Sequence, residues 1–314
     1  MISIAMTTYN GEKYLKEQLD SILSQSYDDF ELIICDDCSK DDTRKILSEY
    51  KNKDNRIKIE FNEKNLGFIK NFDKAIRLCS GDFIAMSDQD DVWTENHLEI
   101  LLNNIGNHYL ICSNAELVDS DGKSLNDFVR PDGFTVCQNG DEQIIQQLVR
   151  NVVQGCTALF RKELIKYFFP IPETAIAHDT WLGDIACLAP AENGLEGLTY
   201  IHESVLKYRQ HGSNTIGVEA ASVKRNINHF NKSSFSHFNE LKTFMDSDSF
   251  SFVTDEHKKN VLKETRKYIS NLSSRKKRMK AFPFFFRHAV SIYAVPRFNL
   301  YVLGWFIKLF VLFK

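Results

Sequence analysis

The sequence predicts an α/β fold in which a mostly parallel central sheet is flanked by helices, followed by a C-terminal helical appendage. The N-terminal part alternates between apolar runs of strand length and segments with apolar residues at helical spacing. Residues 30–35 form an apolar run with almost no polar interruption, as expected for a strand covered on both faces. Such alternation is typical of repeated strand and helix units around a parallel sheet.

Turn and capping residues divide this part of the chain into elements. Asn10 and Gly11 form a turn after the first strand, and Ser80 with Gly81 gives a helix its C-terminal stop. Ser39 followed by Asp42 resembles a helix N-cap with an acidic residue in the first turn. The predicted strands are residues 3–9, 30–35, 57–61, 82–86 and 109–113. The predicted helices are residues 12–25, 41–50, 69–79, 94–102, 141–150 and 162–169.

Length, composition and cysteine content narrow the class of protein. The 314 residues are 43% hydrophobic and 26% charged, which is enough to bury a large core, and a mean hydropathy of -0.31 argues against several membrane spans. The seven cysteines lie mostly beside apolar runs, which favours free thiols in a reducing compartment. No basic segment precedes the first strand, so we expect no secretory signal and a cytoplasmic location.

The charge distribution sets the C-terminal region apart. Residues 265–314 carry 11 Lys and Arg and no Asp or Glu, although the net charge of the chain is -3. An acidic body with a basic, aromatic-rich tail argues against nucleic-acid binding and favours contact with an anionic membrane surface. Residues 300–313 are too short to span a bilayer, so an interfacial helix is expected there. The alternative is that the tail packs on the rest of the protein or on a second subunit, in a homodimer.

Polar side chains gather where three predicted strands end, which is where open parallel sheets bind their ligands. These strand ends are Thr7 to Asn10, Asp36 with Asp37, and the run Asp88, Gln89, Asp90 and Asp91. No glycine-rich dinucleotide motif and no P-loop occurs in the sequence. Three clustered carboxylates are costly unless a cation neutralises them, and oxygen ligands favour magnesium or manganese over zinc. A solvated acidic turn is the alternative interpretation.

Three segments together resemble the family 2 glycosyltransferases, which have the GT-A fold. They are residues 6–10 (MTTYN), 35–43 (CDDCSKDDT) and 87–93 (SDQDDVW). Residues 178–182 (HDTWL) and 208–214 (YRQHGSN) add a likeness to the bacterial rhamnosyltransferase-like branch. The resemblance covers residues 1–217 and implies a nucleotide-diphospho-sugar transferase fold. We therefore predict a catalytic domain at residues 1–220 and an appendage at residues 221–314.

The resemblance also implies roles for individual side chains. Asp179 matches the general base that deprotonates the acceptor hydroxyl, although an N-cap role for this Asp is the alternative. The metal ligands would be Asp90, Asp88 and His211, with the His on a loop that closes over the donor. The nucleotide contacts would be Thr7, Tyr9, Asp36, Asp37, Asp88 and Arg209. Trp93 and Trp181 fit core positions and sugar-stacking positions equally well.

The implied activity is an inverting, metal-dependent transfer of a sugar to a hydroxyl group of a growing bacterial surface polysaccharide. The expected donor is dTDP-rhamnose, with a UDP-hexose as the alternative, and the acceptor is expected to be linked to a polyprenyl lipid at the inner face of the cell membrane. Two other functions compete with this one. A nucleotidyltransferase would need a longer glycine-rich loop after the first strand, and a non-catalytic membrane-bound scaffold would tolerate loss of Asp90 or Asp179.

Overall fold

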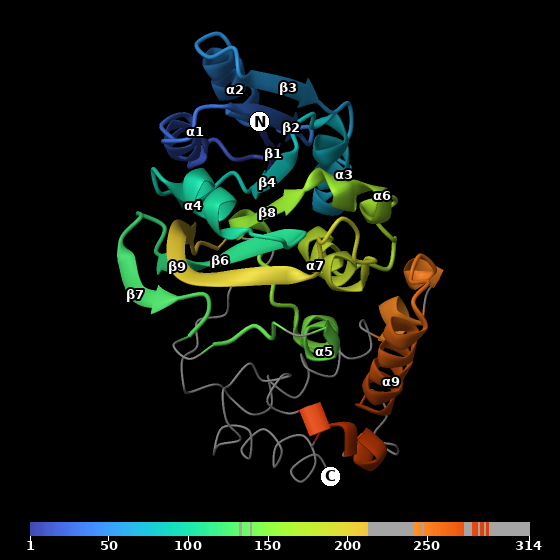
Figure 1. The fold of residues 1–314 in the computed structure, drawn as a ribbon. Helices are drawn as coiled ribbons and strands as arrows, with labels where there is room; N and C mark the ends of the chain where they lie inside the picture. Colours follow the sequence, from blue (N-terminus) through green and yellow to red (C-terminus); the bar gives the residue numbers. More distant parts are fainter. Residues whose placement is uncertain are drawn as a thin grey trace.

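The computed structural model describes residues 1–131, 134–138, 140–212, 242–246, 248–272, 278–281, 283–285, 287 and 288. Within these ranges a nine-stranded mixed sheet has the order β3-β2-β1-β4-β8-β6-β9-β5, with β7 paired to β6 (Figure 1). The strands are β1 (Ile2–Thr8), β2 (Phe30–Asp36), β3 (Ile57–Phe61), β4 (Phe83–Ser87), β5 (Val92–Trp93), β6 (Leu110–Val118), β7 (Ser124–Phe128), β8 (Ala158–Arg161) and β9 (Leu198–Arg209).

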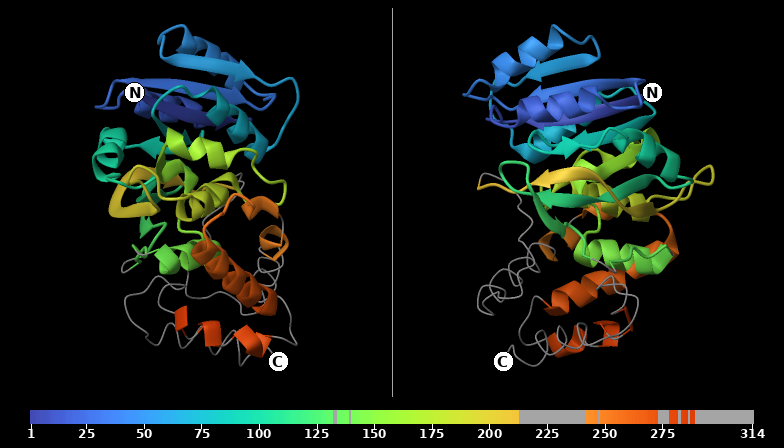
Figure 2. Two further views of the ribbon diagram at one scale, coloured as in Figure 1. Left: turned by 45° about the vertical axis from the view of Figure 1, so that its right-hand side comes forward. Right: turned by 90° about the vertical axis from the view of Figure 1, so that its left-hand side faces the viewer.

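Helices cover both faces of this sheet, as two views at right angles make clear (Figures 1 and 2). The α-helices are α1 (Leu15–Leu23), α2 (Thr43–Lys51), α3 (Phe68–Leu78), α4 (His97–Asn104), α5 (Gly140–Arg150), α6 (Ile165–Phe168), α7 (His178–Leu188) and α9 (Glu256–Leu272). The short 3₁₀ turns are η1 (Gly155–Thr157), η2 (Lys162–Leu164), η3 (Asp248–Phe250) and η4 (Arg278–Ala281).

The N-terminal half of the sheet is parallel, as predicted. β1 pairs in parallel with both β2 and β4, and β2 pairs in parallel with β3. Every residue of β2 is buried, which confirms the strand predicted from its uninterrupted apolar run. Along β1, Ile4 and Met6 pack into one hydrophobic cluster with α1, α2 and α4, whereas Ala5 packs into the other with α3, α5 and α7. Because successive side chains of a strand point to opposite faces, β1 contributes residues to both hydrophobic clusters.

The C-terminal half of the sheet is more antiparallel than the sequence suggested. β8 pairs antiparallel with both β4 and β6, and β5 pairs antiparallel with β9. β5, β7, β8 and β9 were not predicted; β5 and β8 are very short, and β7 is largely exposed. The helix predicted at residues 162–169 is split into η2 and α6.

The described part of the C-terminal region packs on the main body. Tyr268, Ile269 and Leu272 of α9 lie in the same hydrophobic cluster as α5 and α7, and Ala281 and Phe285 are fully buried there. This part of the basic tail therefore follows the packing alternative. Residues 289–314, with the predicted interfacial helix at 300–313, lie outside the described residues, as does the predicted boundary near residue 220.

Lys258 of α9 is bound to the end of α7. Its Nζ donates hydrogen bonds to the carbonyl oxygens of Cys187 (3.1 Å) and Ala189 (2.6 Å). A cation at the C-terminus of a helix stabilises the unpaired carbonyls there.

Among the described helices, none combines the length and the apolar character that a bilayer crossing requires.

The cysteines and two tryptophans are structural. All seven cysteines are free thiols, and most are buried. Trp181 is 2% exposed and its indole Nε1 donates to the Phe168 carbonyl, 2.8 Å away. Trp93 is buried and stacks on His97, with ring centroids 4.0 Å apart. Of the two interpretations left open for these tryptophans, the core position is the one observed.

Candidate active site

A cavity of about 1220 Å³ opens where β1, β2 and β4 end. Among the residues that line it are most of the predicted site residues, namely Thr7, Tyr9, Asp37, Asp88, Asp90, Asp179 and His211. They come from segments far apart in the sequence, and the topology brings them together at one edge of the sheet. Asp36 and Arg209 are not among the lining residues.

The end of β1 is tied to the acidic loop after β4 by a reciprocal pair of hydrogen bonds. The Tyr9 N–H donates to Gln89 Oε1 (2.8 Å), and Gln89 Nε2 donates to the Tyr9 carbonyl (3.1 Å). A Cβ added to Gly11 would lie 2.2 Å from Gln89 Oε1, so a side chain at this position would displace the Gln89 amide. Gln89 was not predicted, because its partners lie 80 residues away. The Tyr9 ring itself is left 47% exposed.

Asp37 holds the loop before α3 and keeps one acceptor position. Its Oδ1 accepts from Asn62 Nδ2 (2.9 Å) and the Leu66 N–H (2.7 Å), and its Oδ2 accepts from the Gly67 N–H (2.9 Å). A carboxylate offers about four acceptor positions. One position on Oδ2 is therefore left on the wall of the cavity.

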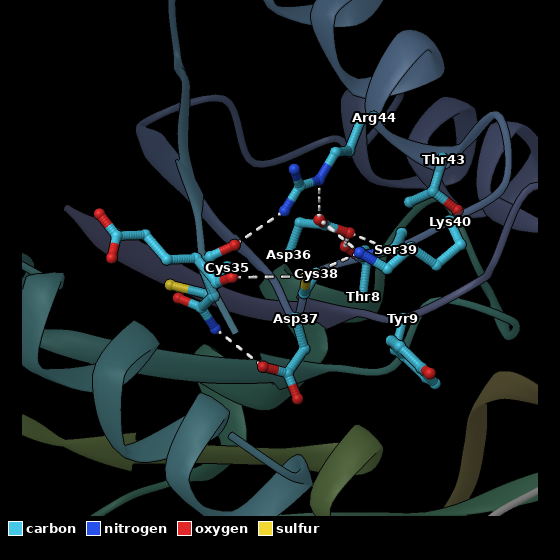
Figure 3. A network of polar contacts seen from close by, with 12 residues as sticks. Thr8, Tyr9, Cys35, Asp36, Asp37, Cys38, Ser39, Lys40, Thr43 and Arg44 are labelled. Atoms are coloured by element: carbon cyan, nitrogen blue, oxygen red, sulfur yellow. Dashed lines mark hydrogen bonds and ion pairs between the residues drawn. The ribbon is translucent and has the colours of Figure 1, made fainter. Parts of the chain in front are cut away.

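Asp36 has a different role from the predicted nucleotide contact. Its Oδ2 accepts from Thr8 Oγ1 and Ser39 Oγ, and its Oδ1 accepts from the Ser39 N–H (3.2 Å) and Arg44 Nε (2.6 Å) (Figure 3). All four acceptor positions are thus occupied and the side chain is fully buried. Asp36 fixes the turn after β2 and does not reach the cavity, because successive residues at a strand end point in opposite directions.

The acidic loop places several carboxyl groups against one another. Burial, together with the negative charges of Asp90 and Asp179, raises the pKa of Asp88 to about 7. Burial and the same clustering raise the pKa of Asp91, and its Oδ2 is buried with no hydrogen-bond partner among the described residues. A group of carboxyl groups that raise one another's pKa fits the donor set of a divalent cation.

His211 meets this loop from the other side of the cavity. Its Nε2 lies 2.9 Å from Asp90 Oδ2, and its ring stacks on Tyr14 with centroids 4.8 Å apart. An imidazole nitrogen and a carboxylate oxygen that face each other in a cavity can ligate one cation together. The structure thus brings Asp90 and His211, two of the predicted metal ligands, into contact at the cavity that Asp88 also lines.

Among the described residues, ligand atoms of Asp88, Asp91 and Cys156 lie within 4.8 Å of one another. The thiol is a poor ligand for magnesium or manganese, because these cations prefer oxygen and burial raises the pKa of Cys156. Neither Asp91 nor Cys156 lines the cavity. The group at Asp90 and His211 is the one a nucleotide could reach.

Arg209 binds the acidic loop and is not among the residues that line the cavity. Its Nε donates to the Asp90 carbonyl (2.9 Å), its Nη2 donates to Glu17 Oε2 (2.5 Å), and its guanidinium lies 4.7 Å from the Tyr14 ring centroid. Its backbone N–H donates to Asp91 Oδ1 (3.1 Å). The side chain is 2% exposed. Arg209 thus positions the loop that carries Asp90, and its predicted contact with a nucleotide phosphate stays a prediction.

Asp179 lies in the first turn of α7 and faces the cavity. Its Oδ1 accepts from the Thr180 N–H (2.7 Å) and its Oδ2 accepts from the Gly155 N–H (3.1 Å). The N-cap of α7 is Ala177, so Asp179 does not cap the helix, which was the alternative. The two N–H donors come from different elements and hold the carboxylate in one orientation.

The neighbouring His178 closes the wall around Asp179. It is buried and stacks on Phe72, with ring centroids 3.9 Å apart, and burial lowers its pKa, which favours the neutral ring. A Cβ on Gly155 would lie 3.2 Å from His178 Nε2 and 3.3 Å from Asp179 Cβ. The glycine therefore permits the close approach of η1 to the start of α7.

The sheet order, with a cavity beside the acidic loop at the strand ends, is that of the GT-A fold. The chain belongs to glycosyl transferase family 2, whose model matches residues 3–169, and it is thus an enzyme of the glycosyltransferase class.

Two relatives illustrate the sequence similarity. TuaG of Bacillus subtilis (strain 168), a glycosyltransferase assigned to teichuronic acid biosynthesis, is 29% identical over 187 residues, which cover 58% of this chain and 71% of TuaG. The Escherichia coli enzyme UDP-Glc:alpha-D-GlcNAc-diphosphoundecaprenol beta-1,3-glucosyltransferase WfgD is 34% identical over 177 residues, 54% of this chain and 64% of WfgD.

Solved structures share the fold over almost the whole chain. TarS residues 1–349 of S. aureus, in complex with UDP-GlcNAc, has a TM-score of 0.56 at 20% identity and covers 98% of this chain and 81% of that one. The mannosyltransferase PcManGT from Pyrobaculum calidifontis, in complex with GDP-Man and Mn²⁺, has a TM-score of 0.50 at 16% identity and covers 99% and 81%. At these identities the likeness establishes the GT-A fold.

Proposed function

We propose that this glycosyltransferase is a metal-dependent, inverting enzyme that transfers a sugar from a pyrimidine nucleotide to a hydroxyl group of a surface polysaccharide. One observation carries the proposal: a nucleotide-binding candidate (Asp37), metal-ligand candidates (Asp90, His211) and a base candidate (Asp179) line the same cavity.

The nucleobase would bind beside Tyr9 and Asp37. The acceptor position left on Asp37 suits the N3–H of uracil or thymine, and Tyr9 offers an exposed ring on the same side of the polar network, away from Arg44 (Figure 3). We place a UDP-hexose ahead of dTDP-rhamnose, the donor expected from the sequence, because WfgD is named for UDP-Glc and TarS was solved with UDP-GlcNAc.

The leaving group would be the nucleoside diphosphate. Held by Asp88, Asp90 and His211, a magnesium or manganese ion would neutralise the charge that develops on this diphosphate. The chain's own contribution is to orient these ligands: Arg209 fixes the Asp90 backbone and Tyr14 supports the His211 ring.

Asp179 would accept the proton of the acceptor hydroxyl while the hydroxyl oxygen attacks the anomeric carbon. The bond from that carbon to the phosphate oxygen breaks in the same step, so the configuration inverts without a covalent intermediate. The N–H groups of Gly155 and Thr180 hold the carboxylate in place for this transfer. General base catalysis of this kind contributes about 10²- to 10⁴-fold.

The acceptor would be a growing polysaccharide linked to a polyprenyl lipid. The name of WfgD gives alpha-D-GlcNAc-diphosphoundecaprenol, a lipid-linked sugar, as the acceptor of that enzyme. The basic and aromatic tail would then rest on the inner face of the cell membrane, and a homodimer is compatible with this arrangement. A truncation that removes residues 289–314 tests this step and spares the buried Ala281 and Phe285. It should release the protein from anionic liposomes, and unchanged co-sedimentation would refute membrane contact through these residues.

The decisive experiment is a panel of nucleotide sugars incubated with the purified protein, in which release of nucleoside diphosphate is measured with Mg²⁺, with Mn²⁺ and with a chelator. We expect metal-dependent release from a single pyrimidine nucleotide sugar, increased by lipid-linked acceptor. Release that persists in chelator would remove the metal from the proposal, and turnover of purine nucleotide sugars alone would remove the pyrimidine site.

A further inference from the structure

Arg130 is a cavity residue that neither the sequence motifs nor the proposed reaction uses. It follows β7, and one asparagine of β6 clamps its backbone: the Arg130 N–H donates to Asn114 Oδ1 (3.0 Å), and Asn114 Nδ2 donates to the Arg130 carbonyl (3.0 Å). Because both polar groups of its backbone are fixed, the side chain leaves the sheet from a defined point.

The guanidinium is held by one of its nitrogens. Arg130 Nη2 donates to the carbonyl oxygens of Asn151 (3.1 Å) and Val152 (3.0 Å), and the guanidinium carbon lies 4.9 Å from the Phe134 ring centroid. Arginine has five N–H donors. The donors on Nε and Nη1 have no protein acceptor among the described residues, and these atoms are not sealed from solvent.

The charge of Arg130 lacks a partner of its own. No ion pair among the described residues includes it. Burial lowers its pKa, the nearby Arg150 lowers it further, and Asp179 is the cavity carboxylate whose charge opposes these effects. A guanidinium stays protonated even when burial is unfavourable. The protein thus keeps a largely desolvated cation in the cavity wall, with three N–H donors open.

We propose that Arg130 forms a binding subsite for an anionic group, a carboxylate or a phosphate, carried by the acceptor saccharide. The planar guanidinium suits either group, because both present two oxygens to a fork of N–H donors. This inference rests on the proposed function only in that the cavity must hold an acceptor.

The acceptor side of the cavity is the better place for such an anion than the donor side. Arg130 is anchored to the segment at residues 151–152, just before the η1 turn whose Gly155 N–H binds Asp179. The donor diphosphate belongs with Asp90 and His211, which carry their own contacts to Arg209 and Tyr14. Arg130 therefore lies on the side of the general base candidate, where the attacking sugar must enter.

The test compares one neutral and one anionic glycoside of nearly equal size. Binding of methyl β-glucuronide and methyl β-glucoside to the full-length protein is measured by ligand-observed NMR, with UDP and Mg²⁺ present so that the diphosphate position is occupied. We expect the wild-type protein to bind the glucuronide at least about tenfold more tightly. Arg130→Gln should abolish this preference, and Arg130→Lys should reduce it, since Lys keeps the charge and loses the fork.

Arg150→Gln is the matched control, because it removes a neighbouring cation that does not line the cavity. It should keep the preference for the glucuronide. Equal binding of both glycosides by the wild-type protein, or no binding of the glucuronide, overturns the inference without any variant having to fold. A preference for UDP-glucuronic acid over UDP-glucose that depends on Arg130 would assign the subsite to the donor sugar and equally overturn the acceptor assignment.

The failure of this inference can be told apart from failure of the proposed function. If no pyrimidine nucleotide sugar is turned over, the proposed function fails. If a donor is turned over and Arg130→Gln leaves selectivity for anionic glycosides intact, only the inference fails.

Discussion

Replacing Asp179 by Asn separates the catalytic role of this side chain from its structural one. The amide has one acceptor oxygen, so it can satisfy either the Gly155 N–H at 3.1 Å or the Thr180 N–H at 2.7 Å, but not both. One hydrogen bond to a half-buried carboxylate is lost, which should cost about 1–2 kcal/mol of unfolding free energy. Loss of the base should cost about 3–5 kcal/mol of transition-state stabilisation, or about 10²- to 10⁴-fold in transfer rate.

Asp184→Asn, on the same helix, is the matched control. Asp184 is buried, burial raises its pKa well above the usual range, and its Oδ1 accepts from Gln147 Nε2 at 3.1 Å. An amide therefore replaces an acid whose neutral form is favoured by burial, and it keeps that hydrogen bond. The two variants are compared by urea unfolding, UDP affinity and initial transfer rate. The reasoning is refuted if Asp179→Asn keeps more than about a tenth of the rate, or if Asp184→Asn loses as much.

Four further outcomes follow from the same contacts. Asp184→Asn should gain stability over the wild type as the pH rises above about 4. The folded wild-type protein retains a proton on Asp184 that the unfolded chain releases, so the stability of the wild type falls as the pH rises. Parallel unfolding free energies of the two proteins from pH 4 to 8 would contradict this prediction. Arg44→Met should lower the unfolding free energy by about 1–3 kcal/mol, since Asp36 keeps a buried charge and loses its cation; a loss of UDP affinity with unchanged stability would instead place Asp36 in the nucleotide site. Gly155→Ala should reduce the transfer rate about tenfold or more at unchanged donor affinity, because the added Cβ would displace the general base candidate Asp179. Kinetics identical to those of the wild type would show that the neighbouring side chains accommodate the Cβ without loss of rate. Lys258→Met should lower the unfolding free energy by about 1–2 kcal/mol in a urea titration, because two carbonyls at the end of α7 lose their donor, and an unchanged midpoint would count against that contact.

The parts of the fold that the sequence predicts are those encoded by local patterns. The β2 strand is recognisable because its apolar run has almost no polar interruption. The acidic loop is recognisable because its carboxylates are close together in the sequence. β8 pairs with β4 and β6 through a segment of four residues, which is too short to show a period. Its place in the sheet depends on tertiary pairing that no local signal reports.

Site residues were predicted less well where two adjacent residues of the same type have different roles. Asp36 and Asp37 are adjacent and chemically alike, yet one is enclosed by four donors and the other reaches the cavity. Which of two successive strand residues faces a ligand depends on register, and register is set by the whole sheet. Gln89 and Arg130 were not predicted as site residues, because their hydrogen-bond partners, Tyr9 and Asn114, are distant in sequence.

The attachment of α7 at both ends has a consequence for any attempt to reduce this enzyme to a minimal catalytic fragment. The helix carries Asp179 at one end and accepts Lys258 at the other, and Trp181 packs against Phe244 and Phe250. A chain cut near residue 220 would therefore uncover the apolar side of the helix that holds the general base candidate. A shortened version of the protein should keep the chain through Phe285, and the described region after the sheet supports the active site rather than being a removable accessory.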